Sequence, residues 1–240
     1  MTDVSGKWTF ITGASRGIGR LAAKFMAQHG SNLILHARTI DALVPVVEEL
    51  DEYGVEVIPV ASELSDLESV NSMLAEIDET GIVVDIVLNN AGLQVGYRSD
   101  WVNTPIEDYP ISFLVNTIAP MMICYHFLPG MMERGFGRIV NTTSGIADQP
   151  EQAGYSAAKA ALDKVTKDVG VKLEGTDVMI NLTDPGWCST DLGGPNAPNP
   201  PETAIPGVVL GVFLDDKKSG RIIHAQDYAG LSLEEAIAKV

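Results

Sequence analysis

Several residue types are scarce in this chain of 240 residues, and each scarcity excludes a class of protein. Only 16 lysines and arginines stand against 32 aspartates and glutamates, which gives a formal net charge of −16. Nucleic acids and anionic membranes require a basic surface, so neither is expected as a partner. The two cysteines and four histidines have neither the number for a disulfide framework nor the spacing of a metal site.

Long uninterrupted apolar runs are also lacking. The most apolar segment, 111–132, contains Asn116, Pro120, His126 and Pro129 and is too interrupted to predict a transmembrane helix. The first ten residues, MTDVSGKWTF, do not combine a charged segment with an apolar one, as a secretory signal does. We therefore expect a cytoplasmic location.

Seven short apolar segments are present, and each has the length of a β-strand. They alternate with longer segments that have helical spacing. Continuous apolar runs suit strands that are buried on both faces. We therefore predict an α/β fold, a Rossmann-type doubly wound sheet of about seven parallel strands with helices on both faces, in a single domain over 1–240. The predicted strands are 7–12, 32–37, 55–61, 85–90, 137–143, 177–184 and 220–225.

One helix boundary and one loop have sequence signals of their own. In SDLESVNSMLAEIDE, Ser65 is followed three residues later by Glu68, the spacing of a capping box, which predicts a helix start at Ser65. The proline-rich stretch 193–202 predicts an irregular loop. Ligands of doubly wound sheets bind beyond the carboxyl ends of the strands, so candidate site residues follow each strand.

A glycine-rich turn, TGASRGIG at 12–19, follows the first predicted strand. Gly13, Gly17 and Gly19 permit a tight turn and a close approach of the backbone to a pyrophosphate, which then lies on the N-terminus of the next helix. The spacing is G-x-x-x-G-x-G rather than G-x-G-x-x-G. Its position between a strand and a helix predicts a dinucleotide site.

The end of the second predicted strand bears on which dinucleotide is bound. NAD sites usually have an acidic residue about 20 residues after the glycines, for the ribose 2′-hydroxyl. Here LHARTID has no acid before Asp41; Arg38 stands there instead, and Arg16 lies in the glycine turn. Two guanidinium groups can bind a 2′-phosphate as forks. We therefore expect NADP(H) to be preferred over NAD(H).

The same turn also matches a hydrolase motif. Residues 13–17 read G-x-S-x-G, the nucleophile elbow of serine hydrolases, and Asp184 or Asp191 and then His224 follow Ser15 in a suitable order. Such an elbow needs an oxyanion donor from a loop after an earlier strand, and only a first strand precedes Ser15. Its position disfavours this alternative, which stays open.

The stretch NTTSGIADQPEQAGYSAAK, at 141–159, places Tyr155 and Lys159 one helical turn apart. A free tyrosine has a pKa of about 10, and a nearby ammonium lowers it, so the phenol can give and take a proton. Counting forward along the fifth predicted strand indicates Ser144 as the hydroxyl that works with Tyr155. Thr142 shares its strand parity and is a backup donor.

Taken together, these motifs resemble the single-domain short-chain dehydrogenase/reductase family over essentially the whole chain. The matching segments are TGASRGIG, NNAG at 89–92, Asn116 in FLVN, Ser144, YSAAK at 155–159 and PGWCST at 185–190. The resemblance implies an NAD(P)-dependent oxidoreductase that interconverts a carbonyl and an alcohol, of the NADP-preferring carbonyl reductase type. It implies that Tyr155 is the general acid/base, Lys159 its electrostatic partner, Ser144 the donor to the carbonyl oxygen and Asn116 part of a proton relay.

The resemblance also implies contacts and partners. Glu63 stands where the family commonly has an aspartate near the adenine. Family members often associate through the helix at 111–132 and the helix that carries Tyr155, so a homodimer or homotetramer is expected. The expected cofactor contacts are Gly13, Ser15, Arg16, Gly17, Ile18, Gly19, Arg38, Glu63, Leu64, Asn90, Ala91, Gly92, Tyr155, Lys159, Pro185, Gly186 and Thr190. The expected substrate contacts are Ser144, Ile146, Tyr155 and Trp187.

Several features leave the substrate and the direction of reaction open. Trp187 either lines the pocket or anchors its loop, and Cys188 is interpreted as a small apolar filler. Tyr97 and Trp101 are pocket or lid aromatics that suggest an apolar or aromatic carbonyl compound. The same fold could act as an alcohol or hydroxysteroid dehydrogenase in the oxidative direction. A non-catalytic nucleotide-sensing domain is a further alternative.

Overall fold

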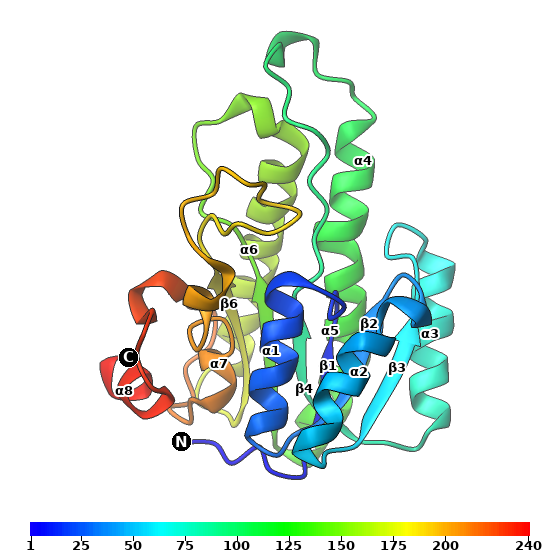
Figure 1. Ribbon diagram of the computed structural model, residues 1–240, viewed down its shortest axis with the longest axis vertical. Coiled ribbons are helices and arrows are strands. Elements are labelled where there is room, and N and C mark those ends of the chain that lie inside the picture. Colours follow the sequence, from blue (N-terminus) through cyan, green and yellow to red (C-terminus); the bar gives the residue numbers. More distant parts are fainter.

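In the computed structural model, which describes residues 1–240, seven parallel strands form one sheet in the order β3-β2-β1-β4-β5-β6-β7. Neighbouring strands pair in parallel throughout, which confirms the predicted doubly wound α/β sheet. The carboxyl ends of the strands point towards the top of Figure 1. The strands are β1 (Trp8–Ile11), β2 (Asn32–Ala37), β3 (Val57–Ala61), β4 (Val84–Asn89), β5 (Gly137–Thr142), β6 (Val178–Asp184) and β7 (Ile222–His224).

Helices cover both faces of the sheet (Figure 1). Alternate residues of each strand enter opposite cores: Phe10 packs into one hydrophobic cluster and Ile11 into the other. The core that contains Ile11 lies under α1, α2, α7 and α8, and the core that contains Phe10 lies under α3, α5 and α6. The helices are α1 (Gly17–Gln28), α2 (Val44–Leu50), α3 (Leu67–Glu79), α4 (Asp108–Phe113), α5 (Ala119–Arg134), α6 (Ala153–Leu173), α7 (Leu210–Phe213) and α8 (Leu233–Lys239).

The start of α3 differs from the prediction. Asp66, not Ser65, is the N-cap, and its carboxylate accepts a hydrogen bond from the backbone N–H of Glu68. Ser65 instead donates from its backbone and its hydroxyl to Glu63. The predicted capping box is therefore wrong by one residue, because aspartate competes equally well with serine for the cap position.

One continuous helical run spans Asp108–Arg134, and its α-helical geometry is interrupted near the middle. Between α4 and α5, the segment Leu114–Ile118 is a π-helix. By length and composition this run of 27 residues could cross a membrane, but 56% of its most apolar window is buried inside the protein. Its apolar residues, including Ile123 and Cys124, pack on the sheet as those of a core helix do.

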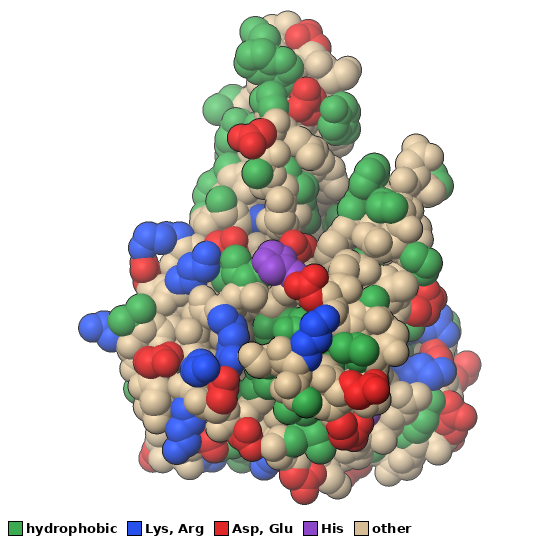
Figure 2. All heavy atoms as spheres, turned by 90° about the vertical axis from the view of Figure 1, so that its left-hand side faces the viewer, with side chains coloured by type: hydrophobic (Ala, Val, Ile, Leu, Met, Phe, Trp, Pro, Cys, Tyr) green, Lys and Arg blue, Asp and Glu red, His purple; other side chains and the backbone are tan.

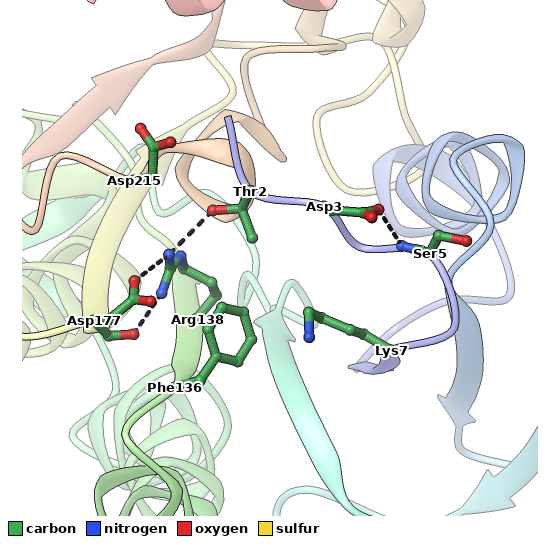
Figure 3. A pocket seen from close by; sticks show the side chains of 8 residues that line it. All are labelled: Thr2, Asp3, Ser5, Lys7, Phe136, Arg138, Asp177 and Asp215. Atoms are coloured by element: carbon green, nitrogen blue, oxygen red, sulfur yellow. Dashed lines mark hydrogen bonds and ion pairs between the residues drawn. The ribbon is translucent and has the colours of Figure 1, made fainter.

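At the opposite edge of the sheet, a cavity of about 350 Å³ lies beside the amino ends of β1, β5 and β6 (Figure 3). Arg138 forms one side of it and is 1% exposed. Its guanidinium donates to carbonyl oxygens of Leu214, Gly137 and Asp177, to the Thr2 hydroxyl and to the Asp177 carboxylate. All five of its N–H groups are satisfied by the chain itself. The arginine therefore fastens the N-terminal segment and the start of β6 to β5.

Candidate active site

Tyr155 and Lys159 lie on the first two turns of α6, at the carboxyl edge of the sheet. Both side chains are buried. The Lys159 ammonium donates a hydrogen bond of 2.7 Å to the carbonyl oxygen of Thr142, the last residue of β5. Its Nζ atom lies 5.9 Å from the centre of the Tyr155 ring. The lysine thus fixes the helix to β5 and places the tyrosine beside the end of that strand.

The proton affinity of Tyr155 is set mainly by its burial. Burial raises the pKa of Tyr155 to about 12. Ser144 lies two residues beyond β5 and opposes this rise through its hydroxyl, whereas the negative charge of Asp184 adds to it. Ser144, rather than Thr142, is therefore the hydroxyl that lowers the pKa of the phenol. At neutral pH the phenol holds its proton.

The expected effect of Lys159 on this pKa is not found. The ammonium is directed at the Thr142 carbonyl, and the pKa of Tyr155 is set by burial, the Ser144 hydroxyl and the charge of Asp184. Burial also lowers the pKa of Lys159 itself to about 8, against the opposing charge of Asp163. The sequence could not show this, because the extent of burial depends on how α6 packs on the sheet.

Asn116 lies in the π-helical segment, and its side chain is fully buried. Its amide donates to the carbonyl oxygens of Leu93 and Ser112, and its Oδ1 accepts from the backbone N–H of Leu93. A Cβ atom added to Gly92 would lie 3.3 Å from Asn116 Oδ1 and 3.8 Å from Lys159 Nζ. The asparagine and the lysine therefore face the same small space beside the NNAG turn.

The glycine turn between β1 and α1 has the backbone that a phosphate cradle requires. Gly13 and Gly17 have φ angles of 68° and 54°, in the left-handed region that favours glycine. A Cβ atom on Gly19 would lie 2.2 Å from the carbonyl oxygen of Gly13. The N-terminus of α1 has no side-chain cap, and the N–H groups of Ser15 and Arg16 donate to no group of the chain. These donors fit the pyrophosphate of a dinucleotide.

The NNAG turn supports the glycine turn from behind. Thr12 accepts hydrogen bonds on its hydroxyl from the backbone N–H groups of Asn90 and Ala91. The Asn90 amide donates to the carbonyl oxygens of Thr12 and Gly13. The predicted contacts therefore lie directly against the glycine turn; they are Asn90, Ala91 and Gly92. The Asn90 side chain points towards this turn and supports it.

The residues expected near the adenine lie at the ends of β2 and β3. Arg38 follows β2 directly, is exposed and forms no ion pair. Glu63 is also exposed, whereas Leu64 is buried in the core. Arg16 forms an ion pair of 3.0 Å with Asp191, so the predicted convergence of Arg16 and Arg38 on one phosphate stays a prediction.

The loop after β6 closes against the glycine turn from the other side. Thr190 lies next to Gly17, where an added Cβ would stand 3.4 Å from its methyl group. Ile18 packs on a small cluster that contains Cys188. Burial raises the pKa of the Cys188 thiol, which agrees with its interpretation as an apolar filler.

The Trp187 indole N–H donates to the Gly193 carbonyl at 2.7 Å, so this exposed ring anchors its own loop. Pro185 and Gly186 begin this loop.

A projecting segment, 93–107, rises above the site at the top of Figure 1, and Figure 2 shows hydrophobic side chains gathered over the projecting end of the molecule. Tyr97 and Trp101 are 62% and 52% exposed there. The Arg98 backbone N–H donates to the Glu151 carbonyl, which joins the projection to the loop that follows Ser144. Ile146, in that loop, is half-buried. Both segments therefore lie at the carboxyl edge of the sheet, where α6 begins.

Two acidic residues that the sequence did not assign to the dehydrogenase site also lie at this edge. Asp163, one turn after Lys159, accepts a hydrogen bond from the Thr143 hydroxyl. Asp184 ends β6 and lies 3.4 Å from His224 Nδ1. The i, i+4 spacing from Lys159 could have indicated Asp163. Only the pairing of β6 with β7 brings His224 to Asp184, and Ser15 has no hydrogen bond to either residue of the hypothetical hydrolase triad.

Both the sequence and the fold of this chain match known proteins. Residues 7–200 match the family model for short chain dehydrogenases. A short chain dehydrogenase from Pseudocercospora fijiensis is 31% identical over 199 residues, which are 81% of this chain and 63% of the relative, so the chain spans less than two thirds of that protein. The 3-oxoacyl-[acyl-carrier-protein] reductase FabG of Aquifex aeolicus is 31% identical over 192 residues, 79% of this chain and 77% of that one.

Solved structures also match this fold. L-sorbose reductase from Gluconobacter frateurii, complexed with NADPH and L-sorbose, matches with a TM-score of 0.79 and 25% identity, over 93% of this chain and 97% of that one. The family model covers most of the chain, and the match to FabG exceeds 30% identity over most of both proteins. The chain belongs to the short-chain dehydrogenase/reductase family and is an NAD(P)-dependent oxidoreductase that acts on alcohol and carbonyl groups.

Proposed function

We propose that the chain is an NADP(H)-dependent reductase of a ketone or aldehyde, with Tyr155 as the general acid. The observation that carries this proposal is the arrangement of Ser144, Tyr155 and Lys159 beside a glycine turn that fits a dinucleotide. A bound nicotinamide cofactor would supply or accept the hydride. The phenol of Tyr155, protonated at neutral pH, is then the group that gives a proton to the carbonyl oxygen.

The other side chains have supporting roles in this proposal. Ser144 donates a hydrogen bond to the carbonyl oxygen of the substrate and holds it near the phenol. Lys159 is tied to the end of β5, and its ammonium is available to attract the phenolate that remains after proton transfer. Asn116 faces the same space as the lysine and is placed to hold a water that returns the proton.

The direction of reaction is the finer part of the proposal. A phenol whose pKa is raised to about 12 is a reservoir of protons at pH 7, which suits reduction. Oxidation requires the phenolate and would be expected only at alkaline pH. An alcohol or hydroxysteroid dehydrogenase is the second candidate, since the Lys159 ammonium lies 5.9 Å from the centre of the Tyr155 ring.

The preference for NADP(H) is supported by Arg38, which stands exposed at the end of β2 where an acidic residue would bind a ribose hydroxyl. It is supported also by the sorbose reductase, which was solved with NADPH. Arg38→Asp should move the preference towards NADH. Lys218→Asp, at an exposed cation that precedes β7 and forms no ion pair, is the charge-matched control.

The proposed function is tested with a panel of ketones, aldehydes, sugars and hydroxysteroids. Consumption of NADPH or NADH is monitored by the absorbance of the reduced nucleotide. Reduction of at least one carbonyl compound, faster with NADPH, is the expected result. Tight binding of NADPH with no turnover on any compound would instead support a nucleotide-sensing domain.

We also propose that the protein forms a homodimer or homotetramer through α5 and α6. Tyr125 and Met132 on α5 and Val171 on α6 are more than half exposed, which is unusual for side chains of this size. Light scattering of the purified protein should give a mass of two or four chains, and Tyr125→Glu should lower it. A monomer at micromolar concentration contradicts this assembly.

A further inference from the structure

Two carboxylates lie on either side of the turn that carries Ser144, and the proposed reaction uses neither. Asp163 accepts a hydrogen bond from the hydroxyl of Thr143, the residue before Ser144. The Asp184 carboxylate lies against Gly145, the residue after Ser144, where an added Cβ atom would stand 2.7 Å from Asp184 Oδ2. The turn that carries the serine is therefore confined between α6 and the end of β6.

Asp184 is itself firmly placed. Its Oδ1 accepts a hydrogen bond of 3.0 Å from the backbone N–H of Gly186, and its Oδ2 lies 3.4 Å from Nδ1 of His224. Only 14% of the Asp184 side chain is exposed, compared with 60% for His224. One carboxylate thus touches the serine turn, the loop that closes on the glycine turn, and β7.

The charge of Asp184 reaches the reacting phenol. The titratable groups around Tyr155 are Lys159 and Asp163 on α6, Asp184 on β6 and, behind it, His224 on β7. Among the charged groups, Asp184 is the one that raises the pKa of Tyr155, because a phenolate would stand near a second negative charge. It acts in the same sense on Asp163, whose pKa is raised first by burial.

We propose that Asp184 is a positioning residue of the reaction: its carboxylate fixes the turn that carries Ser144 and places a negative charge at the edge of the sheet where Tyr155 lies. This inference rests on the proposed function of Tyr155. The negative charge favours the protonated phenol, the form that gives its proton to a carbonyl oxygen during reduction. The same charge opposes the reverse reaction, in which the phenolate takes the proton from the alcohol.

The packing against Gly145 leaves little room for a side chain at this position of the turn. Any Cβ atom would enter the space of the Asp184 carboxylate, so either the turn or the aspartate must move. Because Gly186 is held by the same carboxylate, such a movement would also disturb the loop that faces the cofactor site. The effect of a substitution at Gly145 should therefore appear in turnover rather than in stability.

The test is the pH profile of alcohol oxidation by Asp184→Asn, which keeps the shape of the side chain and an acceptor for Gly186 but removes the charge. The alkaline rise of kcat/KM should move to lower pH by about 0.5 to 1 unit, while the Kd for NADPH stays within about twofold. Asp168→Asn, at an exposed carboxylate nine residues after Lys159 on α6 that pairs with Lys164, is the matched control and should leave the profile in place. A profile in Asp184→Asn that coincides with that of the wild type overturns the proposal.

Two further measurements keep the test decisive. Gly145→Ala should lower kcat at least tenfold, and an unchanged kcat contradicts the positioning role. If the wild type turns over no alcohol or carbonyl compound, the proposed function has failed. The charge effect is then read from NMR of Cζ-labelled tyrosine, with Tyr155 assigned from Tyr155→Phe. An earlier onset of Tyr155 titration in Asp184→Asn supports the effect, and an unchanged onset overturns it.

Discussion

The ammonium nitrogen of Lys159 lies 2.7 Å from the carbonyl oxygen of Thr142, so the lysine expected to act on Tyr155 is also the fastener between α6 and β5. This bond sets the distance between the tyrosine on the helix and the serine beyond the strand. It also explains why the lysine tolerates full burial, since its charge is satisfied by a backbone acceptor. The predictions below test this arrangement and the cofactor cradle beside it.

Ser144→Ala should lower kcat for carbonyl reduction by about 100-fold, because the substrate oxygen loses its hydrogen-bond donor. Thr142→Val should lower it by less than about fivefold, because Thr142 acts on Lys159 through its backbone carbonyl, which valine retains. Steady-state kinetics of both variants decide the matter. A larger loss in Thr142→Val than in Ser144→Ala contradicts the assignment of Ser144.

Gly19→Ala should weaken NADPH binding by at least about tenfold, because the added methyl group would lie 2.2 Å from the Gly13 carbonyl and 2.5 Å from the Asn90 amide. The glycine turn must then open. Gly96→Ala is the matched control, since no atom lies within 4 Å of a Cβ there. Binding is measured by quenching of protein fluorescence. Equal affinities of the two variants would rule out this turn as the cradle.

The stability of the protein should depend on pH through Lys159. Burial lowers its pKa to about 8, whereas the unfolded chain keeps this proton up to the ordinary value of 10.5. Between these values the unfolded state binds more protons than the folded state, so the free energy of unfolding rises with pH. Lys159→Met removes this dependence. From pH 7.5 to 9.5, wild type should gain about 2 kcal/mol relative to the variant.

Urea unfolding of both proteins at the two pH values measures this difference. All other titrating groups are common to the two chains, so their contributions cancel. A difference that stays constant with pH, or moves in favour of the variant, shows that the pKa of Lys159 is not lowered in the folded protein.

Arg138→Met should lower the free energy of unfolding by about 2 to 4 kcal/mol, because the acceptors on Leu214, Thr2 and Asp177 lose their donors at the amino edge of the sheet. Lys164→Met removes an exposed ion pair with Asp168 and should change stability by less than about 1 kcal/mol. The KM values of the Arg138 variant should stay near those of wild type. Equal stability losses in the two variants would contradict the role of Arg138.

Much of the fold followed from the sequence because buried parallel strands leave a continuous apolar pattern. The segments predicted at 32–37 and 137–143 agree with β2 and β5 to within one residue. The segments predicted at 55–61 and 220–225 form shorter strands in the structure, Val57–Ala61 and Ile222–His224. Strand ends are set by pairing with neighbours, which no local pattern reports.

The site was predictable only where its residues are close in the chain. Tyr155 and Lys159 share a helix face by spacing alone. The π-helical segment at Asn116 and the contact between Asp184 and Gly145 depend on how separate elements pack. The raised pKa of Tyr155 has the same origin, because burial is a property of the folded chain rather than of the motif.

The most direct test of the account is the comparison of Tyr155→Phe with wild type in two measurements, NADPH binding and carbonyl reduction. Phenylalanine keeps the ring that packs in the site and removes only the proton donor. The Kd for NADPH should change by less than about twofold, while kcat/KM for reduction should fall by about 1,000-fold, within the range of general acid catalysis. A variant that retains more than a tenth of the wild-type kcat/KM would show that the proton comes from another group.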